Sequence, residues 1–278
     1  MITGDMRLKR DLAMRKLREA IELHAGTTVA VSGCVDDPRF GLAAVEAGAR
    51  ILEPNHGERA LALGYKGAKT MHDTVPIRHE IPVEEMAKAI RGLRNVVGAE
   101  IFIFVGVPGN FTELVPLMMT EEKAEMLAYA GADGLHTHKS TLKDVHDIVD
   151  LGHRMGLLVD AYIADPTDPY PFGIPARTPQ DVARVAGEME QVGVDVIGLV
   201  TNMSYSGAGA GNLDPYVEER LRAMVATVSV PTAVEGGINV SNHRAFRETG
   251  VNILIAGTSV TDAAREGVRR AVAALLTQ

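Results

Sequence analysis

The sequence contains little cysteine, few aromatic residues and no long apolar run. Its one cysteine, Cys34, excludes an intramolecular disulfide and fits a reducing, cytoplasmic compartment. Tryptophan is absent and aromatic residues make up 4% of the chain, which argues against an aromatic surface that stacks on bases or sugar rings. No apolar run approaches the roughly 18 residues that span a bilayer, and the charged first ten residues do not resemble a signal peptide. These absences favour a cytoplasmic protein without a membrane partner.

Net charge and chain length narrow the class of protein further. A formal charge of −8 provides no basic surface for nucleic acid or for an anionic membrane. An anionic ligand therefore has to be bound by local N–H groups and a few cations. The length of 278 residues is close to the usual size of one (β/α)8 barrel.

A weak internal repeat organises the chain. Four segments, at 45–53, 129–136, 191–199 and 248–255, each combine a helix end, a glycine and a short apolar strand. Short apolar strands without alternation are typical of a parallel sheet that is covered on both faces. Eight strands are predicted, at about 28–33, 50–54, 101–106, 132–137, 157–162, 195–200, 231–235 and 252–256. Helices are predicted between them, at 83–94, 120–130, 142–155, 179–192, 214–228 and 241–249.

This pattern predicts an α/β protein, a single (β/α)8 TIM barrel domain over residues 1–278. An extra amphipathic helix at roughly 8–24 precedes the first strand and is expected to close the bottom of the barrel. The alternative is an open doubly wound sheet, which needs a glycine-rich loop after the first strand that this sequence does not supply.

Two predicted connections are too long for simple joints. Residues 54–82 follow the second strand and carry three histidines, and residues 164–179 follow the fifth strand and carry five prolines. Both lie at the C-terminal face, where barrel enzymes have their active sites and where long ordered loops serve as lids. The alternative interpretation is a pair of insertions that contact another subunit in a homo-oligomer.

Small residues end the last two predicted strands. Gly236 and Gly237 follow the seventh strand, and Gly257, Thr258 and Ser259 follow the eighth. Glycine lets the backbone approach a ligand closely, and the helix that begins after Ser259 adds its positive dipole end. We predict a phosphate site here, to which a third glycine-containing loop, after the sixth strand, contributes Gly207. The alternative is that these glycines only serve strand-to-helix turns.

Three carboxylates occupy the ends of predicted strands. Alternate residues of a barrel strand point into the lumen, so Glu53 and Glu235 are expected to face inward, and Asp160 shares a face with Tyr162. Burial raises the pKa of a carboxyl group, which suits a general acid or base. Glu53, Asp160 and Glu235 are therefore predicted to be catalytic. For Glu53 the alternative is a carboxylate that only binds loop N–H groups.

Two histidines end the fourth predicted strand. The spacing of His136 and His138 places both imidazoles on one face, as a metal site requires. With Glu235 or Asp160 they could complete a divalent-metal site that polarises a carbonyl. Imidazoles that bind substrate hydroxyls, with His136 catalytic and no metal, are the favoured alternative. Lys139 follows directly and is expected to bind phosphate or to form a Schiff base.

The C-terminal motifs resemble the ribulose-phosphate-binding barrel superfamily. The segments 233–239 (AVEGGIN) and 256–259 (AGTS) are similar to the phosphate signature of its phosphosugar epimerases and its histidine-biosynthesis barrels. In the epimerases the residue before the paired glycines is an acidic catalytic group and a metal ligand. The resemblance implies that role for Glu235, which replaces an aspartate.

Other segments resemble the tryptophan synthase alpha subunit. The similarity covers 31–38 and 45–53 and implies that Glu53 is a catalytic glutamate. Residues 202–211 resemble that family's phosphate loop, which implies phosphate binding by Asn202, Ser206 and Gly207. The chain departs from the family where Asn55, predicted to bind substrate, lies in place of a loop with a second acid, and where His136 and His138 have no counterpart.

Together these features predict an enzyme that performs acid–base chemistry beside a carbonyl of a phosphorylated, sugar-like molecule. Both a carbon–carbon lyase of the aldolase or decarboxylase type and an isomerase or epimerase pass through such chemistry. Cleavage is slightly favoured because two long lids suit a pocket that excludes water. The alternatives are a Schiff-base aldolase that uses Lys139 and a non-catalytic barrel that binds a phosphate ligand. Cys34 is expected to be a small buried residue without a chemical role.

Overall fold

The protein is a closed barrel of parallel strands. The computed structural model describes residues 4–111, 114–168, 170, 172–201 and 213–277. Within these residues the barrel strands follow the order β4-β3-β2-β1-β9-β8-β7-β5, and β4 also pairs with β5, which closes the ring. Their bounds are Thr28–Val31 (β1), Ile51–Leu52 (β2), Phe102–Val105 (β3), Gly134–Leu135 (β4), Leu158–Ala164 (β5), Val196–Val200 (β7), Thr232–Glu235 (β8) and Ile253–Ala256 (β9). The predicted (β/α)8 TIM barrel is thereby confirmed.

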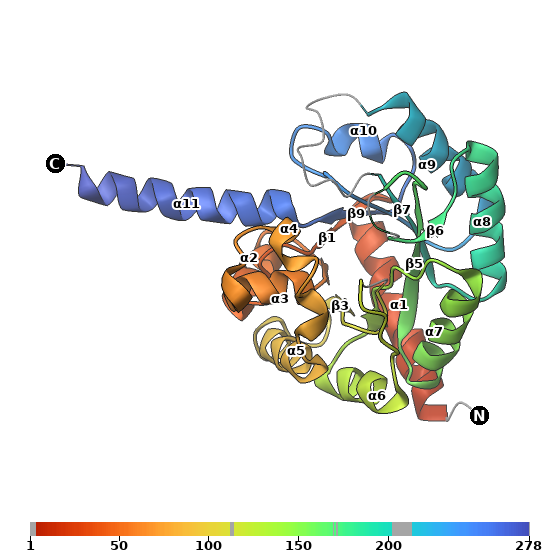
Figure 1. The fold of residues 1–278 in the computed structure, drawn as a ribbon, viewed down its shortest axis with the longest axis horizontal. Helices are drawn as coiled ribbons and strands as arrows, with labels where there is room; N and C mark the ends of the chain where they lie inside the picture. The colour runs from red at the N-terminus through yellow and green to blue at the C-terminus, as the bar shows by residue number, and fades with distance from the viewer. Residues whose placement is uncertain (1–3, 112–113, 169, 171, 202–212, 278) are drawn as a thin grey trace.

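Helices follow the strands and cover the barrel from outside (Figure 1). Several begin where a side chain accepts a backbone N–H of the first turn, as Thr120, Thr141 and Thr178 do. Six of these helices match the predicted ranges to within a few residues: Val83–Val97 (α5), Glu121–Ala130 (α6), Leu142–Arg154 (α7), Pro179–Gln191 (α8), Pro215–Thr227 (α9) and His243–Arg247 (α10). Another helix, α2 (Pro38–Glu46), follows β1.

Both long connections are ordered where they are described. The connection after β2 folds into short helices, namely His56–Ala62 (α3), Tyr65–Gly67 (η1), Met71–Thr74 (α4) and Arg78–Glu80 (η2). The connection after β5 contains a further short strand, β6 (Ile174–Pro175), which pairs with the end of β5. The sequence did not predict β6. This pairing brings Phe172, which is fully buried, against the mouth of the barrel.

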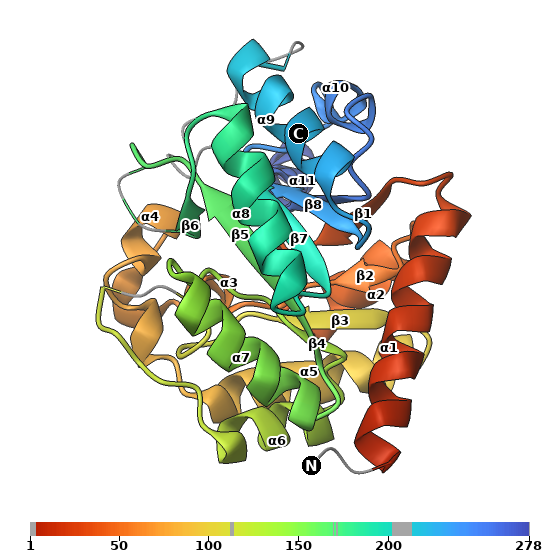
Figure 2. The ribbon, with the colours of Figure 1, turned by 90° about the vertical axis from the view of Figure 1, so that its right-hand side faces the viewer.

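The extra N-terminal helix, α1 (Gly4–Leu23), packs against the beginnings of the strands (Figure 2). Its buried Leu17 belongs to the same apolar cluster as Phe102 and Ile253, which point into the barrel. An ion pair also joins the helix to the barrel, since Lys16 Nζ lies 2.7 Å from Asp133 Oδ1, in the turn before β4. The helix therefore closes the end of the barrel that lies opposite the carboxyl ends of the strands.

The last helix, α11 (Thr258–Leu276), extends away from the barrel and carries the C-terminus (Figure 1). None of its described residues is buried. Its exposed apolar residues recur at helical spacing and form one stripe: Val268, Val272, Leu275 and Leu276. Among the described residues, none of the helices combines the length and the apolar composition that crossing a membrane requires.

Candidate active site

Five predicted residues meet at the carboxyl ends of the strands. Glu53 follows β2, His136 and His138 follow β4, Asp160 lies in β5, and Glu235 ends β8. The Nε2 atom of His136 is 3.5 Å from Glu53 Oε1 and 3.6 Å from Glu235 Oε2. The Nε2 atom of His138 is 3.2 Å from Glu235 Oε2. The predicted strand register therefore holds, because all five side chains point into one site.

The outer nitrogen of each imidazole has an acceptor. His136 Nδ1 lies 2.7 Å from Asp160 Oδ2, and His138 Nδ1 lies 2.9 Å from the backbone oxygen of Phe172. A carbonyl oxygen only accepts, so His138 Nδ1 carries a hydrogen and its Nε2 presents a lone pair. The two Nε2 atoms face each other at 2.9 Å. Two lone pairs at this distance repel each other, so the pair needs a proton or a cation beside it.

Asp160 lies behind His136 and binds several of the groups around it. Besides the imidazole, its carboxylate accepts the backbone N–H of Thr137 at 2.7 Å and the hydroxyl of Tyr162 at 3.2 Å. All of these groups are buried. A carboxylate that accepts three hydrogen bonds is held in place and in turn fixes the orientation of the histidine, as the hydrogen-bond partners of metal-binding histidines do.

Two aromatic rings clamp His138. Its imidazole lies parallel to Phe111, with ring centres 4.7 Å apart, and parallel to Tyr162, with ring centres 4.9 Å apart. Room for the Tyr162 ring exists because Gly198 on β7 has no side chain, and a Cβ there would lie 2.1 Å from the tyrosine ring. The two rings fix the plane of the His138 imidazole, and the hydrogen bond from Nδ1 to Phe172 directs Nε2 toward His136 and Glu235.

Burial and neighbouring charge perturb the titration of the site. Burial raises the pKa of Glu53 to about 8, against the opposing effect of His136 and with a further upward contribution from Glu235. Burial alone lowers the pKa of His136, but the carboxylates of Asp160 and Glu53 outweigh it and raise the pKa to about 10. For His138, burial prevails and lowers the pKa. Without a metal, the proton of the imidazole pair therefore resides on His136.

The remaining predicted site residues do not all belong to this cluster of five. Asn55 caps α3 through its side-chain oxygen, and its amide nitrogen donates to Ser32, which in turn donates to Glu53 at 3.2 Å. The amine of Lys139 donates to the backbone oxygen of Phe111 at 3.3 Å. Asn202, Ser206 and Gly207 lie outside the described residues.

Two of the predicted phosphate loops directly follow β8 and β9, but the helix after β9 begins at Thr258 and not after Ser259 as expected. Gly236 and Gly237 have φ angles of +108° and +67°, which favour glycine. Gly257 directly follows β9, and α11 begins at Thr258 and includes Ser259.

One expectation was wrong. Cys34 is half-buried rather than buried, and its thiol lies 3.6 Å from Thr261 Oγ1. Gly33 and Val35 on either side of it are buried, and no strand pattern predicts the partial exposure of Cys34.

Sequence reasoning missed three aromatic and cationic neighbours of the histidines. Phe111, Phe172 and Arg78 come from the connections after β3, β5 and β2, and each is nearly or fully buried against the site. None lies at a strand end, so strand register carried no signal for them. The histidines in residues 54–82 drew attention to the correct connection but not to Arg78.

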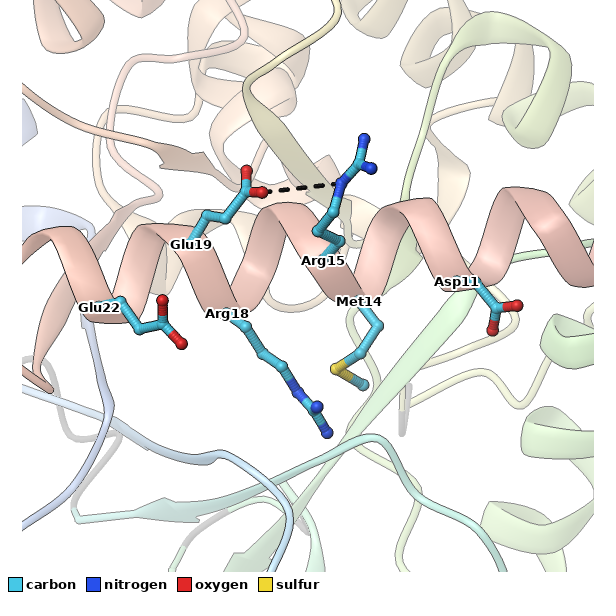
Figure 3. Close-up of a pocket in the computed structure, with 6 residues that line it drawn as sticks. All are labelled: Asp11, Met14, Arg15, Arg18, Glu19 and Glu22. Atoms are coloured by element: carbon cyan, nitrogen blue, oxygen red, sulfur yellow. Dashed lines mark ion pairs between the residues drawn. The ribbon is translucent and has the colours of Figure 1, made fainter.

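A shallow hollow elsewhere on the surface is separate from this site (Figure 3). It runs along α1 and is lined by Asp11, Met14, Arg15, Arg18, Glu19 and Glu22. Its Arg15 and Glu19 form an ion pair at 3.6 Å. None of the five converging residues lines it, so it is not part of the candidate active site.

Comparison with known proteins defines the fold class. No protein-family model and no curated protein sequence matches the chain. Among solved structures, it is similar to 2,3-dimethylmalate lyase, a member of the PEP mutase/isocitrate lyase superfamily, with a TM-score of 0.63, 17% identity, and coverage of 95% of this chain and 87% of that one. It is also similar to phosphonopyruvate hydrolase in complex with oxalate and Mg²⁺, with a TM-score of 0.63, 13% identity, and coverage of 96% and 86%.

A third similar structure is the tryptophan synthase alpha subunit of Legionella pneumophila, with a TM-score of 0.62, 15% identity, and coverage of 93% and 90%. The predicted resemblance to that subunit thus holds at the level of the fold. At these identities the similarities establish a TIM barrel and leave the reaction to be argued from the site.

Proposed function

We propose that this protein is a divalent-metal-dependent enzyme that moves a proton beside a carbonyl group of a phosphorylated small molecule. The observation that carries the proposal is the pair of imidazole Nε2 atoms that face each other at 2.9 Å beside Glu235. Metal-binding histidines typically donate their other ring N–H to a carboxylate or a backbone carbonyl, as His136 and His138 do here.

The donor set fits a divalent metal. Ligand atoms of His136, His138 and Glu235 all lie within 4.8 Å of one another. Glu235 is the most exposed of the three, with 17% of its side chain accessible, so the site is open on that side. Two imidazoles and one carboxylate suit a transition metal such as Zn²⁺ better than Mg²⁺, which prefers oxygen ligands. A bound metal would supply a Lewis acid that polarises a substrate carbonyl.

Glu53 is the proposed acid–base group. Its Oε2 atom has no hydrogen-bond partner among the described residues, while Oε1 is held by Ser32. A pKa of about 8 allows it to take up and release a proton near neutral pH. Asp160 keeps His136 in place, and Phe111 and Tyr162 cover the faces of the His138 imidazole and so shield it from water.

Proton transfer beside a carbonyl serves both a lyase and an isomerase. We favour carbon–carbon cleavage because ordered segments after β2 and β5 flank the mouth and limit the access of water to a reactive intermediate. The phosphate is proposed to bind near Gly236 and Gly237 and at the N-terminus of α11. The left-handed backbone of the two glycines and the position of this helix end directly after β9 support that assignment.

A homo-oligomer is also proposed. The apolar stripe on α11, formed by Val268, Val272, Leu275 and Leu276, is between 49% and 85% exposed. A helix with such a stripe gains stability by packing against another chain.

Metal analysis and proton exchange test the proposed function. The purified protein is expected to contain about one equivalent of metal, and His136→Ala should remove both the metal and the activity. Glu53→Gln should keep the metal and reduce the rate by roughly 10²–10⁴-fold, as loss of a general acid–base group does. The assay is deuterium exchange from solvent into a panel of phosphorylated ketoses and keto acids. Wild-type protein that binds no divalent metal, or a Glu53→Gln variant with unchanged exchange, would refute the proposal.

A further inference from the structure

Asn110 is a buried polar residue that the chemistry above does not use. It lies in the connection between β3 and α6, and none of its surface is exposed. Its side-chain NH₂ group donates to the backbone oxygen of His136 at 2.8 Å. Its own backbone oxygen accepts the N–H of His138 at 3.2 Å. One residue therefore binds the backbone on both sides of Thr137, in the segment that carries the two imidazoles.

These two hydrogen bonds continue the sheet where a strand ends. β3 pairs with β4 as far as Val105 and Leu135, and the backbone oxygen of Val105 accepts the N–H of His136 at 3.0 Å. β3 ends at that point. A buried peptide group without a hydrogen bond is costly, so the segment that carries His138 needs a donor and an acceptor from elsewhere. Asn110 supplies one of each.

The turn around Asn110 fixes the orientation of its amide. Its Oδ1 accepts the backbone N–H of Val107 at 3.1 Å, and its backbone N–H donates to the oxygen of the same residue at 3.3 Å. A backbone N–H only donates, so Oδ1 faces Val107 and the NH₂ group faces the carbonyl of His136. The next residue is Phe111, whose ring stacks on the imidazole of His138 with ring centres 4.7 Å apart. The same turn thus contacts both the backbone of the histidine segment and one of its rings.

A second group holds this segment from β5. Asp160 accepts the N–H of Thr137 and Nδ1 of His136, both at 2.7 Å. Side chains from two separate parts of the chain therefore bind three consecutive residues, His136 to His138. The 2.9 Å separation of the two Nε2 atoms depends on the position of this backbone, because each ring moves with the backbone that carries it.

We propose that Asn110 is a positioning residue that keeps the imidazoles of His136 and His138 at the separation and orientation that a shared metal requires. Its amide supplies both the acceptor for Val107 and the donor for His136, whereas an aspartate of the same shape supplies acceptors only. A functional site needs its groups held within about 0.5 Å of the productive geometry, so support from outside the reacting groups matters. The inference rests on the proposed function for the metal, but the positions of the two rings can be measured without it.

Two substitutions of Asn110 test this role. Asn110→Asp keeps the shape but places an acceptor against the carbonyl of His136, and Asn110→Ser removes the NH₂ group. NMR of the metal-free protein, labelled with ¹⁵N in histidine, measures the scalar coupling between the two Nε2 nuclei across the hydrogen bond that joins them at 2.9 Å. The wild type should show this coupling at pH 7, and both variants should lose it. In chelator competition with Zn²⁺, both variants should bind at least about tenfold more weakly than the wild type.

Asn252 provides the matched control at the opposite end of the barrel. Its Oδ1 accepts the backbone N–H of Thr232 at 2.9 Å, and its Nδ2 donates to the backbone oxygen of Gly26 at 3.1 Å. Asn252→Asp and Asn252→Ser therefore lose hydrogen bonds of the same kind, but they should keep the coupling and the Zn²⁺ affinity of the wild type. Equal losses in the Asn252 variants would reveal a general effect of lower stability and would overturn the proposal.

The possible outcomes separate this role from the proposed function. If the wild type binds no Zn²⁺ but both Asn110 variants lose the coupling, the metal assignment fails and the positioning role stands. A wild type without the coupling, or folded Asn110 variants that keep it, would overturn the role. Where the wild type binds Zn²⁺, folded variants within about twofold of its affinity would overturn it as well.

A crystal structure of the wild type decides the question if neither variant folds. An Asn110 amide within hydrogen-bond distance of the His136 oxygen would support the role, and an amide that lies farther away would overturn it.

Discussion

Replacement of Asp160 by asparagine should change how metal binding depends on pH. The carboxylate accepts from His136 Nδ1 and from the N–H of Thr137, both at 2.7 Å, and from the hydroxyl of Tyr162 at 3.2 Å. An amide of the same shape offers one oxygen and one NH₂ group. At least one donor would then face another donor, and the negative charge behind His136 would be lost.

The size of the effect follows from competition between the proton and the metal. The metal-free protein holds a proton on His136 with a pKa of about 10. Because pH 7 lies about three units below this pKa, removal of the proton at pH 7 costs about 4 kcal/mol. Metal affinity in the wild type should therefore rise about tenfold per pH unit between pH 7 and pH 9.

The Asp160→Asn variant combines two opposing changes. Loss of the carboxylate removes a main cause of the raised pKa of His136. The proton therefore competes less with the metal, and metal affinity rises less steeply with pH. Loss of the hydrogen bond that His136 Nδ1 donates to the carboxylate weakens metal binding by about 10–100-fold at a pH where no proton competes. The variant should thus bind metal more weakly than the wild type at pH 9, and the difference should narrow at pH 7.

Competition between the protein and a chelator of known pH dependence measures both profiles with Zn²⁺ or Mn²⁺. Asp168→Asn, which changes a half-buried carboxylate in the connection after β5, is the control and should behave like the wild type. A wild-type affinity that is constant from pH 7 to pH 9, or equal slopes for wild type and Asp160→Asn, would refute the reasoning.

Three further predictions concern the ligand, the assembly and the fold. Gly237→Val forces a branched side chain onto a backbone with φ of +67° in the proposed phosphate loop. It should weaken the binding of a phosphorylated ligand at least tenfold more than the binding of its dephosphorylated analogue. Equal losses in titrations of both ligands would remove the phosphate assignment. Val272→Glu combined with Leu275→Glu on α11 should shift the mass measured by light scattering from oligomer to monomer, and a monomeric wild type would contradict this. Burial lowers the pKa of Lys9 to about 8, so the folded state binds this proton more weakly than the unfolded state, and wild-type stability should rise between about pH 8 and pH 10.5. Lys9→Met should therefore increase the free energy of unfolding by about 1–3 kcal/mol at pH 7 in urea titrations, with a gain that shrinks across that window; a gain independent of pH would show that the charge is not its cause.

The sequence predicted the barrel because each β/α unit carries its signals locally. A glycine after a helix, a short apolar strand and a small residue at the strand end recur with little dependence on distant contacts. The same local order placed Glu53, His136, His138, Asp160 and Glu235 at strand ends. In a closed parallel barrel those ends meet, so their convergence followed from register alone.

Other features required the folded chain. The pairing of β6 with the end of β5 joins segments whose match is not visible in the sequence, since two residues, one of them a proline, form no strand pattern. Cys34 was expected to be buried, but the turn after β1 leaves its side chain half-buried, which depends on how neighbouring connections pack.

What the sequence alone determined is thus the scaffold and the set of acids and imidazoles at its mouth. The tertiary structure decided what those groups can do. Phe111 stacks on His138 opposite Tyr162, and the backbone oxygen of Phe172 accepts from its Nδ1; these contacts from separate segments orient the imidazole so that the two Nε2 atoms meet at 2.9 Å. Strand register is a local, periodic property of the chain, whereas the orientation of a ring and the burial of Arg78 depend on contacts between segments that are far apart in the sequence.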